Sequence, residues 1–163
     1  GVTSQKVKRT QRDSDPAKTI RAASASVAAE PVDVALVGIG ENGHLAFNDP
    51  PADFDTDEPY LTVELDEPCR QQQVGEGWFE SMAEVPTHAI SMSIRQILKT
   101  RQVYCSVPDK RKAKAVRDTL CEPIGVNVPA SALRQHANTV LVIDEAAASQ
   151  LPAELLESAE RIS

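Results

Sequence analysis

Side chains that could move protons are concentrated in the segment GENGHLAFNDP, residues 40–50. It contains one imidazole, His44, and a carboxylate, Asp49, five positions later. An imidazole exchanges a proton near neutral pH, and a carboxylate can orient it. Five residues turn about 500° along an α-helix, so only a loop can bring this pair together. The pair is a candidate catalytic site, and its alternative is a structural histidine in a plain turn.

Glycines surround this histidine. Gly38 and Gly40 would let a ligand approach the backbone closely, and the dipeptide Asn42-Gly43 can adopt positive φ and form a sharp turn. Because Asn-Gly is common in turns, the dipeptide alone predicts only a change of direction.

A second candidate site is the segment VPDKRKAKAVRDTL, residues 107–120. Asp109 is a suitable helix N-cap, and Lys110, Arg111 and Lys112 crowd the first turn. The partial positive charge of a helix N-terminus disfavours such cations by up to about 1 kcal/mol each. A bound anion would reverse that cost, and helix N-termini bind phosphate readily. An anion site and a solvated run of charge are equally compatible with this pattern.

Alternating elements must position these side chains. The near-continuous apolar run over 34–39 predicts a strand buried on both faces, as in a parallel sheet. Further strands are expected over 60–65, 88–94, 102–107 and 139–144, and helices over 16–30, 94–100, 110–121 and 153–162. This order predicts an α/β fold of three layers, with a mainly parallel sheet flanked by helices in a Rossmann-like manner. Ligands of such sheets bind beyond the carboxyl ends of the strands, where His44 follows the first one.

Composition limits the function further. The chain has 163 residues, 41% of them apolar, and a formal net charge of −7. This charge excludes a protein that grips nucleic acid by global attraction. No apolar run is long enough for a membrane span, and the polar N-terminus lacks the pattern of a signal peptide. The three cysteines are widely spaced and interpreted as reduced thiols, so we expect a cytoplasmic protein with no metal and no cofactor.

The chain consists of two regions that differ in charge and periodicity. Residues 1–14 carry a basic cluster without helical or strand periodicity, which predicts a flexible tail or, as the alternative, an anion-binding arm. Residues 15–163 are predicted to form the domain, beginning with a helix that Asp15 caps and Pro16 opens.

The segment GIGENGHLAFNDP closely resembles the signature loop of glucosamine-6-phosphate deaminases, also called isomerases. The resemblance continues through VPTHAISMSIRQIL, VYCSVPDKRKAKAV and PASALRQHANTVLVID, and covers roughly residues 16–148. The related 6-phosphogluconolactonases share the pattern G-x-G-x-D-G-H. They lack the continuation that Ala46 to Pro50 provide here, which makes a lactonase the less favoured reading.

The resemblance implies a reaction and a set of roles. Glucosamine 6-phosphate and water would give fructose 6-phosphate and ammonia after the sugar ring opens, without a cofactor. His44 would move the ring-opening proton, Asp49 would support it, and Asn42 occupies a position that is Asp or Asn in the family. Lys110 would hold the sugar phosphate. Backbone groups at the glycines Gly38, Gly40 and Gly43 would lie against the substrate.

The sequence also departs from the family. Asp49 stands where many members have Glu, and Arg70 is the nearest candidate for a phosphate-binding arginine that precedes VPTHA in many members. The N-terminal half that supplies a phosphate loop and the base at carbon 2 is not recognisable, so we expect an incomplete domain. It would pair with a complementing N-terminal half or form a homo-oligomer. The alternative function is a sugar-phosphate binding or sensing module without catalysis.

Overall fold

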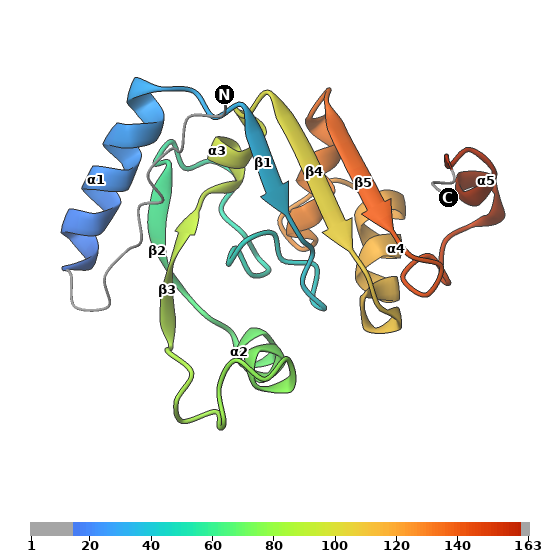
Figure 1. The fold of residues 1–163 in the computed structure, drawn as a ribbon, viewed down its shortest axis with the longest axis horizontal. Helices are drawn as coiled ribbons and strands as arrows, with labels where there is room; N and C mark the ends of the chain where they lie inside the picture. The colour runs from blue at the N-terminus through green and yellow to red at the C-terminus, as the bar shows by residue number, and fades with distance from the viewer. Residues whose placement is uncertain (1–14, 161–163) are drawn as a thin grey trace, which may run out of the picture.

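Three parallel strands form the central sheet of the computed structural model, which describes residues 15–160. Strands β1 (Val34–Val37), β4 (Gln102–Val107) and β5 (Thr139–Ile143) follow one another in the order β1-β4-β5 (Figure 1). In the register, Val34 lies opposite Gln102 and Val103 lies opposite Thr139. The carboxyl ends of β1 and β4 therefore lie side by side, and the two candidate sites predicted from the sequence begin there.

A second sheet is separate from the first. Strands β2 (Tyr60–Glu64) and β3 (His88–Met92) pair antiparallel, with Glu64 opposite His88. The connection between them contains helix α2 (Glu67–Gly75), which the sequence analysis did not predict. Its signals are nevertheless present, because Asp66 caps the helix and Pro68 stands in its first turn.

The predicted helices are present, with changes at their ends. Helix α1 (Pro16–Ala29) is capped by Asp15, whose carboxylate accepts a bond from the N–H of Ala17 at 3.0 Å. The remaining predicted helices are α3 (Ile94–Leu98), α5 (Ala153–Glu157) and the 3₁₀ turn η1 (Lys110–Lys112), which runs into α4 (Ala113–Cys121). The turn η2 (Pro129–Gln135) was not predicted. Residues 1–14, which were predicted to be a basic tail, lie outside the described part.

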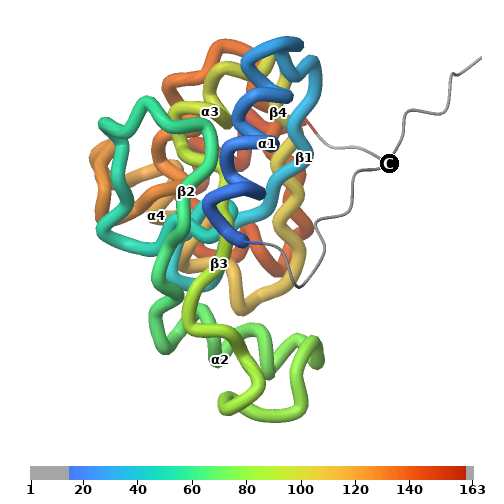
Figure 2. Tube along the Cα trace, turned by 90° about the vertical axis from the view of Figure 1, so that its left-hand side faces the viewer, coloured from blue at the N-terminus to red at the C-terminus, as the bar shows by residue number. Residues whose placement is uncertain are grey.

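The core lies on one side of the central sheet. Val103, Cys105 and Val107 of β4 point into it and are at most 1% exposed, and Ile97 and Val116 pack in the same cluster. Viewed from the side, α3 and α4 lie together on one side of β1 and β4 (Figure 2). Among residues 15–160, no helix has the length and apolar character needed to cross a membrane.

The opposite face of the sheet corrects one prediction. The apolar run was expected to be buried on both faces, but Val34 and Leu36 of β1 are 50% and 81% exposed. The α/β class and the parallel central sheet are confirmed. The described part of the chain covers only one face of that sheet with α3, α4 and η2 (Figure 1).

Candidate active site

A tight loop follows β1 and places His44 at the carboxyl end of the sheet. The N–H of Gly40 donates to the carbonyl of His44 at 3.0 Å, and the N–H of Gly43 donates to the carbonyl of Gly40 at 3.0 Å. Gly43 has φ of 86°, a conformation that favours glycine. Leu45 is fully buried beneath the loop and fixes it to the core.

The predicted pair is formed. Nδ1 of His44 lies 3.0 Å from Oδ1 of Asp49, and the two side chains are 9% and 7% exposed. This distance lies within the range of a hydrogen bond. A carboxylate on Nδ1 leaves Nε2 as the ring nitrogen that can exchange a proton with a ligand.

Asp49 is held by a network that extends to helix α2. Asn42 donates from Nδ2 to Asp49 at 2.9 Å and to Asp66 at 3.2 Å, while its Oδ1 accepts from the N–H of His44 at 3.1 Å. The N–H of Asp66 also donates to Asp49 at 3.2 Å. Burial raises the pKa of Asp49, but contacts with His44, Asn42 and that N–H outweigh it, so the pKa is lowered. Asp49 is therefore ionised at neutral pH and orients His44.

A buried amide anchors the far end of the loop. Asn48 donates from Nδ2 to the carbonyls of Leu45 at 2.7 Å and Met92 at 2.9 Å. The N–H of Phe47 donates to Oγ of Ser91 at 3.1 Å. These bonds hold the loop to β3, so the second sheet fixes the position of the histidine from the other side.

A pocket of about 740 Å³ opens beside His44. Its lining includes Gly38, Gly40, Ser106, Arg111 and Lys112. Two of these side chains are cationic, so the pocket combines a proton-transfer group with positive charge, and an anionic ligand of sugar size would suit it.

The two cationic side chains of the pocket differ in exposure and in how tightly a carboxylate binds them. The side chain of Lys112 is 11% exposed and lies 3.8 Å from Glu76, a distance at which the pairing is loose. Arg111 is 53% exposed and is bound to Asp109 at 3.0 Å. Asp109 has φ of 88°, an uncommon conformation for a residue with a side chain. Lys112 is therefore the better placed cation for a ligand.

The structure brings together some of the predicted residues and separates others. His44, Gly38 and Gly40 line the pocket, whereas Asn42 and Asp49 support His44 from behind. Gly43 shapes the loop without lining the pocket. Lys110 is exposed and does not line the pocket, which Lys112 does.

Arg70 does not lie in the pocket either. Its guanidinium donates to the carbonyls of Met82 at 2.7 Å and Val85 at 3.2 Å, and so it secures the connection before β3. Asp66 was missed by the sequence analysis, although its place before Pro68 is a helix-start signal.

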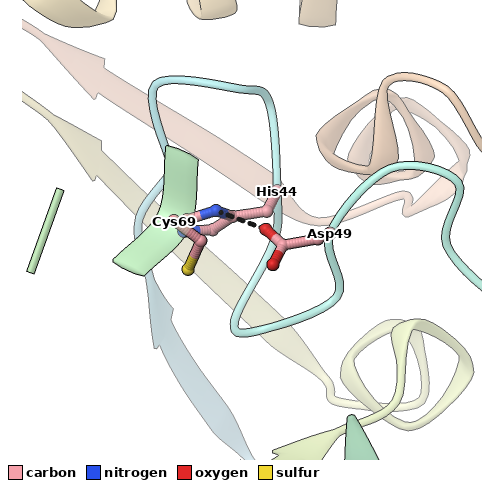
Figure 3. Close-up of side chains that lie close together, drawn as sticks. All are labelled: His44, Asp49 and Cys69. Atoms are coloured by element: carbon pink, nitrogen blue, oxygen red, sulfur yellow. Dashed lines mark ion pairs between the residues drawn. The ribbon is translucent and has the colours of Figure 1, made fainter. Parts of the chain in front are cut away.

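One cysteine also lies at this site. Cys69 of α2 is buried, and its side chain lies beside His44 and Asp49 (Figure 3). Its Sγ, a ring nitrogen of His44 and a carboxylate oxygen of Asp49 are all within 4.8 Å of one another. The sequence analysis interpreted the three cysteines as simple thiols. Spacing along the chain could not reveal this cluster, because Cys69 is 25 residues from His44 and reaches it through α2.

The fold and site define a class: an open α/β domain with a histidine–carboxylate pair at the carboxyl end of a parallel strand. Residues 2–142 match the family described as glucosamine-6-phosphate isomerases and 6-phosphogluconolactonase. The chain belongs to the glucosamine-6-phosphate deaminase/isomerase family.

Individual relatives agree with this assignment. The chain is 41% identical to a glucosamine-6-phosphate deaminase of Latilactobacillus sakei over 125 residues, which are 77% of this chain and 52% of that protein. It is 41% identical to one of Bacillus cereus over 123 residues, 76% of this chain and 45% of that protein. The chain thus spans about half the length of the curated relatives that it matches.

Solved structures show the same relation. A monomeric glucosamine-6-phosphate deaminase of the NagB superfamily superposes with a TM-score of 0.78 and 34% identity, over 85% of this chain and 56% of that one. A 6-phosphogluconolactonase of Trypanosoma brucei has a TM-score of 0.64 at 19% identity, over 88% of this chain and 57% of that one. The latter likeness concerns the fold alone. The prediction of an incomplete domain is confirmed by these coverages.

Proposed function

We propose that this chain forms the ring-opening part of a glucosamine-6-phosphate deaminase. The observation that carries the proposal is the contact between His44 and Asp49 at the rim of a pocket that also contains the buried cation Lys112. The sequence similarity to deaminases supports the choice of substrate.

The first step needs only this site. Opening a pyranose moves the proton of the anomeric hydroxyl to the ring oxygen while the bond between carbon 1 and the ring oxygen breaks. An imidazole can accept the first proton and return it to the leaving oxygen. Asp49, which is ionised and bonded to Asn42, stabilises the imidazolium that exists between the two transfers.

The later steps need a base at carbon 2. Two carboxylates line the pocket, and both are engaged: Asp109 by Arg111, and Glu76 by Trp78 and Gln72. We therefore assign that base to the part of the deaminase fold that this chain does not span. The isolated chain is expected to open the ring without releasing ammonia.

Recognition of the phosphate is assigned to Lys112. The family resemblance points to Lys110, but Lys110 is exposed and Lys112 is the lysine that lines the pocket. The η1 turn precedes α4, so a phosphate at Lys112 would also lie near backbone N–H groups at the beginning of that helix.

Exchange between the α and β anomers tests ring opening directly, because it requires no base at carbon 2. Saturation-transfer NMR on glucosamine 6-phosphate should show faster exchange with the chain than without it. His44→Ala should remove about 10²–10⁴-fold of that acceleration. His88→Ala, which alters an exposed histidine of β3, is the matched control and should keep it.

The coverage of about half of each relative favours a second candidate, a sugar-phosphate binding module without catalysis. Binding of glucosamine 6-phosphate with no acceleration of anomer exchange would support the module and overturn the ring-opening proposal. No binding at all would contradict both.

A further inference from the structure

A cluster of three different donor atoms lies behind the pocket. A ring nitrogen of His44, a carboxylate oxygen of Asp49 and Sγ of Cys69 are all within 4.8 Å of one another. Nδ1 of His44 and Oδ1 of Asp49 are 3.0 Å apart. The three side chains converge from the signature loop and from α2 (Figure 3). With zinc–ligand bonds of 2.0–2.3 Å in a tetrahedron, ligand atoms are about 3.3–3.8 Å apart. Shifts of an ångström or less would bring these atoms to such distances.

The imidazole of His44 belongs to this buried cluster. His44 is 7% exposed, and its Nδ1 lies 3.0 Å from Oδ1 of Asp49. The carboxylate of Asp49 is thus the polar neighbour of this nitrogen, and a metal ion would have to replace that contact. A metal ion would bind Nδ1 in place of its proton.

The charge around Cys69 also favours a cation. The carboxylates of Asp49, Asp66 and Glu76 surround this thiol with negative charge. The same carboxylates would attract a divalent ion. Binding would displace the thiol proton to solvent.

We propose that His44, Asp49 and Cys69 form a binding site for zinc or a similar borderline-soft divalent ion. They supply three protein ligands of the types that zinc prefers, with one position left for water. The ion would occupy the space between His44 and Asp49 that their contact now uses. Bound metal and the proton relay therefore exclude each other, and zinc inhibits ring opening. The inhibition rests on the proposed function, whereas the binding does not.

Cobalt(II) titration of the tag-free chain tests binding without any enzyme assay. We expect one ion per chain, tetrahedral d–d bands and a sulfur-to-cobalt charge-transfer band, with zinc displacing cobalt. Cys69→Ala should remove the charge-transfer band and weaken binding at least about tenfold, since even outer-shell changes cost 10–100-fold. Cys121→Ala, at an exposed thiol, is the matched control and should change neither.

Zinc X-ray absorption on the unaltered chain keeps the test valid if Cys69→Ala does not fold. One sulfur and two or three nitrogen or oxygen ligands are expected. The proposal is overturned by a first shell without sulfur, by the absence of binding, or by a charge-transfer band that Cys121→Ala removes. Binding without inhibition of anomer exchange would contradict the ring-opening role of His44 and leave the metal site standing.

A second, independent observation concerns the uncovered face of the central sheet. Five apolar side chains on this sheet are at least 40% exposed, and they come from all three strands: Val34, Leu36, Tyr104, Val140 and Val142. Successive side chains of a strand point to opposite faces, so the alternating positions of β1 and β5 share one face. In residues 15–160 no helix lies over it (Figure 1). Parallel sheets are normally covered on both faces.

We infer that this face is the docking surface for the remaining half of a deaminase fold. The relatives are about twice as long as the matched region, and the structure of the monomeric deaminase extends well beyond the 56% that superposes. Strand β1 ends the sheet order within the described residues, so its outer edge can pair with a further strand. An apolar face and an open edge together suit an α/β unit that continues the sheet.

Co-expression with the part of the Latilactobacillus sakei deaminase that this chain does not match tests the surface. A 1:1 complex is expected by size-exclusion chromatography with light scattering. The double variant Val140→Asp/Val142→Asp should prevent it, and Leu156→Asp, at an equally exposed position of α5, should not. A chain that ignores the added half, or that forms a homodimer which the double variant dissociates, would contradict the inference.

Discussion

The imidazole of His44 occupies the space that a side chain at position 40 would need. A Cβ atom built on Gly40 would lie 2.2 Å from Cε1 of His44 and 2.4 Å from its Nδ1. Real Cβ atoms do not approach other atoms so closely, and His44 is too buried to move aside freely. Gly40 is therefore required by the ring that it supports, not by its own backbone conformation.

Replacement of Gly40 should displace the imidazole of His44. Gly40→Ala is expected to break the contact between His44 and Asp49 and to lower the acceleration of anomer exchange about 10²–10⁴-fold. The imidazole resonances of His44 in a long-range ¹H–¹⁵N spectrum should shift. Gly75→Ala is the control, because a Cβ there meets nothing within 4 Å. Unchanged His44 resonances in Gly40→Ala would contradict this packing.

The sequence offered His44 and Asp49 as a candidate pair from their residue types, but their spacing of five could not show that the loop brings them together. It could not separate Lys110 from Lys112. Successive residues of a 3₁₀ turn are about 120° apart, so neighbouring lysines face different sides, and residue types alone do not show which one faces the pocket. Asp66 and Cys69 reach the site through α2, a tertiary relation that no local pattern contains.

Local sequence patterns also could not show that one face of β1 is exposed. An apolar run such as Val34–Val37 has the same composition whether its second face is covered by this stretch of chain or by another one. The pattern predicted burial on both faces, but the 81% exposure of Leu36 shows that the described residues do not cover the second face. An apolar run predicts a strand, but it does not identify the segment that covers the second face of that strand.

Asp49 should make the free energy of unfolding decrease at acid pH. Its pKa is lowered in the folded chain, so its contribution to the free energy of unfolding is present above the ordinary value near 3.8 and is lost as the pH falls through the folded value. Urea denaturation between about pH 6 and pH 3 should show a smaller acid loss for Asp49→Asn than for the unaltered chain. Asp33→Asn changes an exposed ion pair and should follow the unaltered chain. Identical slopes for both variants would contradict the assignment.

Asn42, which donates to two carboxylates, should contribute to the stability of the fold. Asn42→Ala removes the donor to Asp49 and Asp66 and leaves two partly buried acids near each other. Loss of a buried partner costs about 1–3 kcal/mol. Urea denaturation at neutral pH measures it, and the loss should shrink at acid pH, where one carboxylate can take up a proton. A variant as stable as the parent at neutral pH would show that the network contributes little.

The three thiols should differ in reactivity. Burial raises the pKa of Cys69 and of Cys105 to about 12, and alkylating reagents attack the thiolate. Cys121 is exposed. Mass spectrometry after iodoacetamide treatment near pH 8 should therefore find one modified cysteine in the native chain and three after denaturation. Because both pKa values are raised on folding, the stability that they contribute is present below about pH 9 and is lost toward pH 12. Native labelling of Cys69 would mean that α2 opens readily.

The lysines of the η1 turn allow a direct comparison. Lys112→Ala should weaken binding of glucosamine 6-phosphate about 10–100-fold, since a charge-assisted hydrogen bond contributes about 1.5–3 kcal/mol. Unphosphorylated glucosamine should bind the variant and the parent equally weakly. Lys110→Ala is the matched variant, with the same change of charge two residues earlier at an exposed position, and should lose much less. Isothermal titration calorimetry at two salt concentrations separates the local contact from the general loss of charge, because only the latter is screened strongly. A larger loss for Lys110→Ala would return the phosphate site to the residue that the family resemblance indicated.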